Sequence, residues 1–163
     1  QSGRKISLPY GVEALRCYEG VKLQKKTEEV SERTEEVQEL NMEGTTSWVN
    51  ESFRTRIFPY SGEKILEKKY TKWFDCDKIN CELSVRTRRS GDYMIVNQSG
   101  GRKKLTRCMI DDKIPGEIRQ EIPLVAAKDE VLWIVGGRIS ERYKITSQTE
   151  KVLEITYQGG NLE

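Results

Sequence analysis

The chain has 163 residues, a formal net charge of +2, 36% hydrophobic residues and 33% charged residues. This length allows one domain with an appendage, and its hydrophobic core can be large enough to be stable without disulfide bonds or a bound metal. No run approaches the roughly 18 apolar residues of a membrane span, and no signal-peptide pattern opens the sequence, so we expect a soluble cytoplasmic protein. The chain has no histidine, which excludes Ser-His and Cys-His nucleophile chemistry.

The cysteine spacing gives little support to a metal site. Four residues separate Cys76 from Cys81, where a zinc knuckle usually has two, and without histidine only an all-cysteine site would fit the usual structural pattern. A Cys76–Cys81 disulfide is a weaker alternative to two reduced thiols in a cytosolic protein. We therefore expect no metal site. Because the sequence also has no histidine, no P-loop and no dinucleotide fingerprint, we expect no bound cofactor and no catalytic residue in this chain.

The N-terminal third divides into a strand-like and an acidic part. Alternating apolar residues on both sides of a proline–glycine turn predict a β-hairpin segment over residues 1–26. Residues 27–43 then carry seven Glu against one Arg, a net charge of −6, and are interpreted as a solvated linker over residues 27–45. A charged exposed strand or a short helix is the structural alternative.

From residue 46 to residue 158 the pattern predicts one α+β domain, followed by a frayed tail over residues 159–163. Strands and turns alternate at the spacing of an antiparallel sheet, and the apolar run 131–135 predicts a central strand covered on both faces. We expect these strands to form an antiparallel or mixed sheet. Trp48, Trp73 and Trp133 are interpreted as core residues rather than platforms for stacking bases.

Two short helices complete this expectation. Residues 102–114 are predicted to be helical because Leu105, Cys108 and Met109 share one face, and Pro115 ends that segment. Residues 116–122 form the second predicted helix. The other expected strands lie at residues 84–88, 93–96, 124–127, 138–145 and 152–157.

Positive charge is concentrated between residues 86 and 107. This segment has seven Lys or Arg against Asp92 alone, a net charge of +6 in a chain whose total is +2. Such a concentration attracts polyanions by counterion release and makes nucleic acid the leading partner class. Asp92 is interpreted as a turn former or an arginine partner rather than a catalytic acid. The acidic linker could compete with RNA for this surface.

A two-glycine loop precedes three of these basic residues. Gly100 and Gly101 would let backbone N–H groups approach an anion, and the predicted helix would add the positive end of its dipole. The alternative is a solvated loop before a helix.

An ordered series of segments then carries a family resemblance: WFDCDKI, LSVRTRRSGDYM, GGRKKL, MIDDKIP, IPLV, LWIVGGRIS and TEKVLEI. In this order they resemble the C-terminal domain of bacterial tRNA(Ile)-lysidine synthetase. The N-terminal KISLPYGVEALRCYEGVKL is similar to the hairpin segment that leads into that domain, so the resemblance covers nearly the whole chain.

The resemblance implies a role in tRNA modification. The family enzyme is an ATP-dependent ligase that adenylates the wobble cytidine of a tRNA(Ile) with a CAU anticodon and joins lysine to it, forming lysidine. Its SGGxDS-type motif, in an N-terminal PP-loop domain that would use ATP and Mg²⁺, is absent here, where the two-glycine sequence is SGGRKK. We therefore expect a non-catalytic fragment whose partners are the tRNA acceptor stem and the catalytic domain of the same protein.

The resemblance also implies a fold and a set of contact residues. The fold is expected to be a layered, sandwich-like α+β unit, similar to the B3/B4 region of the phenylalanyl-tRNA synthetase β subunit. The tRNA-binding candidates are Arg86, Arg88, Arg102, Lys103, Lys104 and Arg138. A second line comprises Arg89, Arg107, Arg142 and Lys144.

One departure from the family pattern concerns Ser90, where family members often have proline; this turn is expected to be less rigid. The rival hypothesis is a protein-interaction module that uses the acidic linker and the basic surface. The oligomeric state, a homodimer included, is left open by the sequence.

Overall fold

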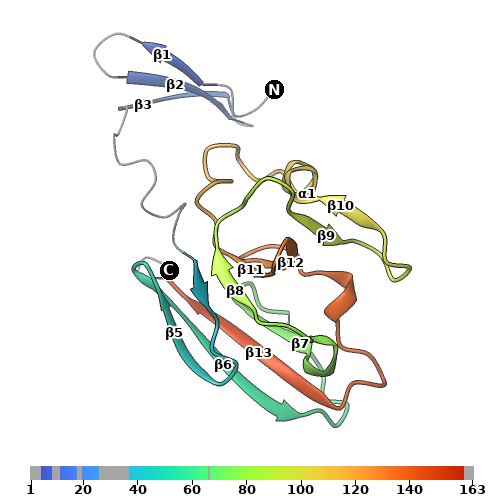
Figure 1. The fold of residues 1–163 in the computed structure, drawn as a ribbon. Helices are drawn as coiled ribbons and strands as arrows, with labels where there is room; N and C mark the ends of the chain where they lie inside the picture. Colours follow the sequence, from blue (N-terminus) through green and yellow to red (C-terminus); the bar gives the residue numbers. More distant parts are fainter. Residues whose placement is uncertain (1–4, 9–11, 18–19, 26–36, 66, 160–163) are drawn as a thin grey trace.

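The computed structural model describes residues 5–8, 12–17, 20–25, 37–65 and 67–159, with side chains from residue 37 onward. The first three ranges form an antiparallel sheet of β1 (Lys5–Leu8), β2 (Val12–Cys17) and β3 (Gly20–Lys25) (Figure 1). The sequence predicts a β-hairpin over residues 1–26, and the described parts of that range form three antiparallel strands. Most of the predicted acidic linker, residues 27–36, lies outside the described residues.

A mixed six-stranded sheet forms the middle of the main body, in the order β10-β9-β12-β11-β8-β4. Its pairs are antiparallel except for β12 and β9, which are parallel. Its strands are β4 (Gln38–Glu39), β8 (Ser84–Arg86), β9 (Tyr93–Ile95), β10 (Arg102–Lys104), β11 (Leu124–Ala127) and β12 (Glu130–Ile134). Every residue of β12 is buried, which confirms the predicted central strand.

A second, antiparallel sheet has four strands in the order β5-β6-β13-β7. They are β5 (Gly44–Trp48), β6 (Glu51–Pro59), β7 (Thr71–Asp75) and β13 (Lys151–Gln158). One apolar cluster joins the two sheets, and in it the ring centroids of Phe74 and Trp133 lie 6.5 Å apart. Trp48 and Trp133 are buried, as predicted, whereas Trp73 is half-buried and donates from Nε1 to Glu154 at 2.8 Å.

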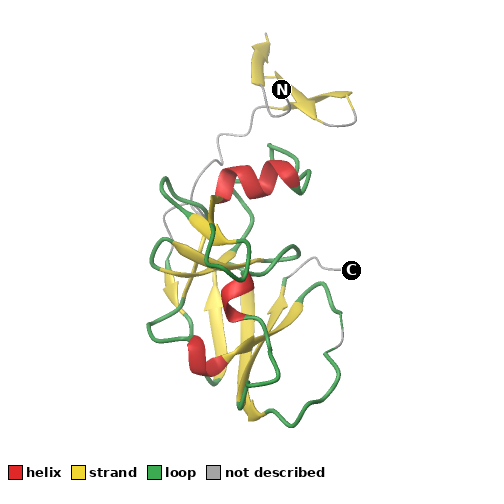
Figure 2. Cartoon of the chain, turned by 90° about the vertical axis from the view of Figure 1, so that its right-hand side faces the viewer, coloured by secondary structure: helices red, strands yellow, loops and turns green. Residues whose placement is uncertain are grey.

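The single α-helix within the described ranges, α1 (Leu105–Asp111), belongs to a second apolar cluster. Leu105, Cys108 and Met109 form its buried face, as the sequence predicts, and pack with residues of β11 and β12. Figure 2 shows this helix and the short 3-10 turns beside the strands. The layered α+β architecture is therefore confirmed. No helix in the described ranges is long and apolar enough to cross a membrane.

Two predicted elements are wrong in type, and the helix predicted over residues 102–114 is too long at both ends, since α1 spans Leu105–Asp111. Residues 102–104 form edge strand β10, paired with β9, so the helix begins only at Leu105. Residues 116–122 form turns rather than a helix. The N–H of Ile118 donates to the carbonyl of Pro115, and the N–H of Glu121 donates to the carbonyl of Ile118, so each bond closes a turn between residues three apart. Residues 138–145 contribute an isolated bridge at Ile139 and a 3-10 turn, Glu141–Tyr143, instead of a strand.

The main body begins earlier than residue 46. β4 pairs with β8 through Gln38 and Glu39, and Leu40 is 3% exposed within the cluster between the sheets. The last residues of the predicted linker therefore belong to the folded body, since their backbone completes the edge of the six-stranded sheet.

Candidate functional site

The Arg86 side chain lies inside the protein. It is 2% exposed, and Nη1 and Nη2 each donate to a carboxylate oxygen of Asp92 at 2.8 Å. Nη1 also donates to the carbonyl of Thr87 at 3.0 Å, and Nη2 to the carbonyl of Lys128 at 2.6 Å. This burial corrects the expectation that Arg86 faces RNA: its guanidinium is held by acceptors inside the protein and does not reach the surface.

Asp92 completes this arrangement from the turn between β8 and β9. Its Oδ2 also accepts the backbone N–H of Arg89 at 2.7 Å, and its carbonyl accepts the N–H of Leu105 at 2.9 Å. The interpretation of Asp92 as a turn former and arginine partner is confirmed. Asp92 is the only acidic residue between residues 86 and 107, and it is paired with Arg86. The other six Lys and Arg residues of this segment therefore have no acidic partner within the segment itself.

The two-glycine loop is a hairpin turn between β9 and β10. The N–H of Gly101 donates to Asn97 Oδ1 at 2.8 Å, and the N–H of Gly100, at φ 86°, donates to the carbonyl of Asn97 at 3.2 Å. The strand Arg102–Lys104 separates this loop from α1. The expectation of an anion held by glycine amides at a helix start is therefore wrong, because both amides already donate within the loop.

Acidic side chains just beyond the segment neutralise part of its charge. Lys103 and Arg107 both contact Asp111, the latter at 3.3 Å. Lys103, beside Asp111, holds the pKa of that carboxyl below its usual value. Arg138 forms a two-pronged pair with Asp112 at 2.7 and 2.5 Å, which raises the pKa of Arg138.

Two second-line candidates, Arg142 and Lys144, are also paired. Arg142 Nη1 lies 3.2 Å from Glu130, and Lys144 Nζ lies 2.5 Å from Glu141. Since an ion-paired cation must give up or share its partner to contact an anion, these residues and Arg138 contribute less to an anion site than unpaired cations would.

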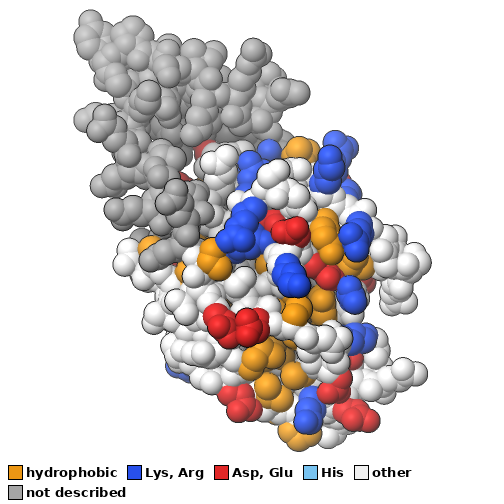
Figure 3. Space-filling view, in the orientation of Figure 1, with side chains coloured by type: hydrophobic (Ala, Val, Ile, Leu, Met, Phe, Trp, Pro, Cys, Tyr) orange, Lys and Arg blue, Asp and Glu red, His pale blue; other side chains and the backbone are white. Residues whose placement is uncertain are grey.

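Four candidates have no acidic partner within the part of the chain that the structure describes: Arg88, Arg89, Arg102 and Lys104. Arg102 lies over the ring of Tyr93, with 4.4 Å from its guanidinium carbon to the ring centroid. Figure 3 shows Lys and Arg side chains gathered over the upper part of the described surface, where Figure 1 places β9, β10 and α1. We call these four residues the cationic edge.

Arg88 is half-buried next to a second arginine. Burial lowers the pKa of Arg88, and the charge of Arg119 lowers it further. Arg119 is 9% exposed, and its Nε donates to the carbonyl of Ile114 at 2.8 Å. Sequence reasoning did not single out Arg119, because its closeness to Arg88 depends on how two distant segments fold together. An anion beside Arg88 would relieve this repulsion.

A cavity of about 390 Å³ lies beside β7 and β9, with Trp73, Ile95 and Ile139 among its lining residues. Its lysines and its arginine contact carboxylates: Lys72 with Glu67 at 3.8 Å, and Lys144 and Arg138 as described above. The cavity therefore offers apolar surface and balanced charge rather than an excess of either sign.

Cys76, Cys81 and Cys108 are free thiols. Cys76 and Cys108 both have a thiol pKa raised by burial, which favours the neutral form over a nucleophilic or metal-binding thiolate. No cluster of three or more Cys, Asp or Glu able to hold a metal ion occurs among the residues searched, those that the structure describes.

A family model and a solved structure both match the part of the chain that contains these residues. The profile of the TilS substrate C-terminal domain matches residues 83–155, which span β8 to β13 and the whole basic segment. A solved structure, the crystal structure of a TILS C-terminal domain, superposes with a TM-score of 0.63 and 26% sequence identity, covering 78% of this chain and 98% of that one.

Curated relatives extend the similarity over nearly the whole chain. The tRNA(Ile)-lysidine synthase of Caldanaerobacter subterraneus subsp. tengcongensis is 38% identical over 154 residues, 94% of this chain and 33% of the relative. That of Clostridium perfringens is 32% identical over 171 residues, 97% of this chain and 36% of the relative. The chain thus spans about a third of the length of these relatives. By sequence and by fold, it belongs to the tRNA(Ile)-lysidine synthase family, of which it carries the C-terminal domain.

Proposed function

We propose that this chain is the tRNA-recognition module of a cytoplasmic ATP-dependent ligase that converts the wobble cytidine of tRNA(Ile) with a CAU anticodon to lysidine. The module grips the acceptor stem, while nucleotide and lysine chemistry takes place in the part of the enzyme that lies outside this third of the relatives' length. The single observation that supports this most is the cationic edge, which lies within the span matched by the TilS domain.

An A-form stem is recognised mainly through its phosphates and 2′-hydroxyls, because its major groove is too deep and narrow for side chains. Arginine suits this task, since its planar guanidinium can donate to two phosphate oxygens at once. The exposed Arg89 and Arg102 and the half-buried Arg88 offer such donors, and Lys104 adds a point charge beside them. The expected contacts are therefore with the RNA backbone rather than with base edges.

The two-glycine loop gives no support to an ATP site in this chain. The two-glycine loop that could have cradled a phosphate uses its amides for Asn97, and its sequence continues as Arg-Lys-Lys rather than the Asp-Ser of the family motif. We propose that ATP and Mg²⁺ act with the catalytic domain and that this module presents the tRNA to it, without a catalytic residue of its own. The alternative of a protein-interaction module is not favoured by the family match.

Binding to two halves of the same tRNA tests this proposal. A minihelix of the acceptor stem and a stem-loop of the anticodon arm, matched in nucleotide count, would each be titrated with the chain at several salt concentrations. We expect the minihelix to bind at least about tenfold more tightly, with a log–log salt slope of roughly −3 to −4 for about four phosphate contacts. Equal affinity for the two RNAs would contradict acceptor-stem recognition, and a flat salt response would contradict phosphate binding altogether.

A further inference from the structure

The turn between β11 and β12 consists of two residues, Lys128 and Asp129, and its first residue has an unusual backbone. Lys128 is exposed and has φ 55°, in the left-handed region that glycine and asparagine adopt readily and that lysine seldom adopts. Residues held in this conformation cluster at functional sites, where the surrounding structure holds them in place. The sequence identified Lys128 and Asp129 only as a break between strands.

Two hydrogen bonds tie this turn to the basic segment. Arg86 Nη2 donates to the carbonyl of Lys128 at 2.6 Å, and the N–H of Tyr93 donates to the carbonyl of Asp129 at 3.0 Å. The same Arg86 is paired with Asp92, which accepts the N–H of Arg89. The backbones of Lys128 and Arg89 are therefore connected through one buried ion pair, Arg86–Asp92.

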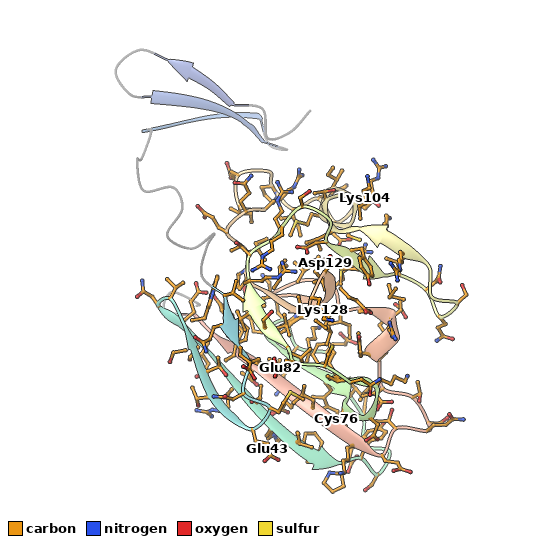
Figure 4. All side chains as sticks on the ribbon, viewed as in Figure 1. Glu43, Cys76, Glu82, Lys104, Lys128 and Asp129 are labelled. Atoms are coloured by element: carbon orange, nitrogen blue, oxygen red, sulfur yellow. The ribbon has the colours of Figure 1, made fainter. Side chains whose placement is uncertain are left out.

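The turn also lies close to the other members of the cationic edge. Tyr93, which bonds to Asp129, pairs in register with Lys104 across β9 and β10 and carries the guanidinium of Arg102 on its ring. Figure 4 labels Lys104, Lys128 and Asp129 in this part of the molecule. Asp129 is the exposed acid next to Lys128, and Glu130, the next residue, is paired with Arg142.

We propose that the β11–β12 turn is a further element of the RNA-contacting surface and that Lys128 binds a phosphate oxygen of the RNA backbone. This inference rests on the proposed function. The Arg86–Asp92 pair holds the turn against the 87–92 turn, so that Lys128, Arg89 and Lys104 face one stretch of RNA backbone. The ammonium group of lysine suits a phosphate as a strongly hydrated point charge on a flexible stem.

The left-handed backbone of Lys128 makes a clean test available. Lys128→Asn and Lys128→Gly remove the charge at a position that asparagine and glycine occupy without strain, so both variants should unfold at the same temperature as the parent or higher. Lys151→Asn, an exposed lysine at the start of β13 in the other sheet, is the matched control. Each protein is titrated with the acceptor-stem minihelix across a salt series.

We expect both Lys128 variants to bind about threefold to tenfold more weakly, with a salt slope shallower by about 0.7 to 0.9, and Lys151→Asn to bind like the parent. Unchanged affinity and slope in the folded Lys128 variants would overturn the inference. The proposed function would still stand in that case, provided that the parent binds with a steep salt slope and Arg89→Ala weakens it. A parent protein that binds no tRNA would refute the proposed function itself.

Discussion

The guanidinium of Arg86 and the carboxylate of Asp92 form a two-pronged ion pair of 2.8 and 2.8 Å, with side chains 2% and 1% exposed. The pair joins two turns, since Arg86 also bonds to the carbonyl of Lys128 and Asp92 to the N–H of Arg89. The side chain of Arg86, which was expected at the surface, thus connects these two turns from inside the protein.

Removing one partner of this pair should be far more costly than replacing both. Arg86→Ala leaves the Asp92 carboxylate buried without its partner, and we expect the free energy of unfolding to fall by about 3–5 kcal/mol. The double variant Arg86→Met with Asp92→Leu should regain much of that loss, because well-packed apolar side chains can replace a buried pair. Urea denaturation measures both values.

The double variant also tests whether the ion pair positions Arg89 and Lys128 for RNA binding, separately from its effect on stability. It removes the acceptor of the Arg89 N–H and the donor to the Lys128 carbonyl, so we expect weaker binding to the acceptor-stem minihelix even where stability is regained. Arg56→Met, which breaks the Arg56–Glu154 pair in the other sheet, is the control. Because the Arg56 side chain is 62% exposed, we expect the free energy of unfolding to fall by about 1 kcal/mol or less. Parent-like RNA affinity in the stable double variant would contradict the positioning role.

Two adjacent lysines should differ in their contribution to RNA binding. Lys104 has no acidic partner in the described chain, whereas Lys103 contacts Asp111. We expect Lys104→Ala to weaken minihelix binding by about threefold to tenfold, and Lys103→Ala by less, because an already paired cation releases fewer counterions. A titration of both variants across a salt series checks this order, and the reverse order would show that the Asp111 contact does not persist in the complex.

A side chain at Gly101 should displace the side chain of Asn97. A Cβ there would lie 2.5 Å from Asn97 Nδ2, and Asn97 is the residue whose Oδ1 accepts the N–H of Gly101 and the hydroxyl of Ser99. We expect Gly101→Ala to displace Asn97 and to lower the free energy of unfolding by about 1–3 kcal/mol. Thermal unfolding measures this cost. Ser99→Ala keeps the Asn97–Gly101 bond and serves as the milder comparison; equal stability of the two variants would contradict the role given to Asn97.

The Arg56–Glu154 contact should make stability depend on pH in the acid range. Arg56 holds the pKa of Glu154 below its ordinary 4.5, with a further contribution from the Trp73 donor. Because the folded pKa is depressed, the stabilisation is present above that ordinary value and is lost as pH falls through the folded pKa. Glu154→Gln should therefore flatten the fall in urea midpoint below about pH 4.5, whereas Glu121→Gln, at an exposed position, should not.

Some elements of the fold could be predicted because their cause is local. The apolar run 131–135 predicts a strand covered on both faces, and β12 lies between β9 and β11 with every residue buried. The i, i+3, i+4 spacing of Leu105, Cys108 and Met109 likewise predicts the buried face of α1. In these cases hydrophobic periodicity alone specifies which side chains turn inward.

Other elements depend on pairing between distant residues and were predicted wrongly. Residues 102–104 continue a helical pattern in sequence, but their backbone pairs with Tyr93–Ile95 and becomes an edge strand. Residues 138–145 have a strand-like composition, yet only Ile139 finds a partner, Trp133. Strand pairing is non-local, so its outcome is decided by which edges remain available after the core has packed.

By itself, the sequence determined the family of the chain and the excess of positive charge between residues 86 and 107. Only the tertiary structure decided which of those charges reach the surface unpaired. Arg86 is held by a carbonyl 42 residues away, and Arg138 by a carboxylate 26 residues away, while Arg89 and Lys104 keep no acidic partner among the described residues. Composition fixes the number of charges, whereas ion pairing and burial depend on distances that exist only once the chain has folded.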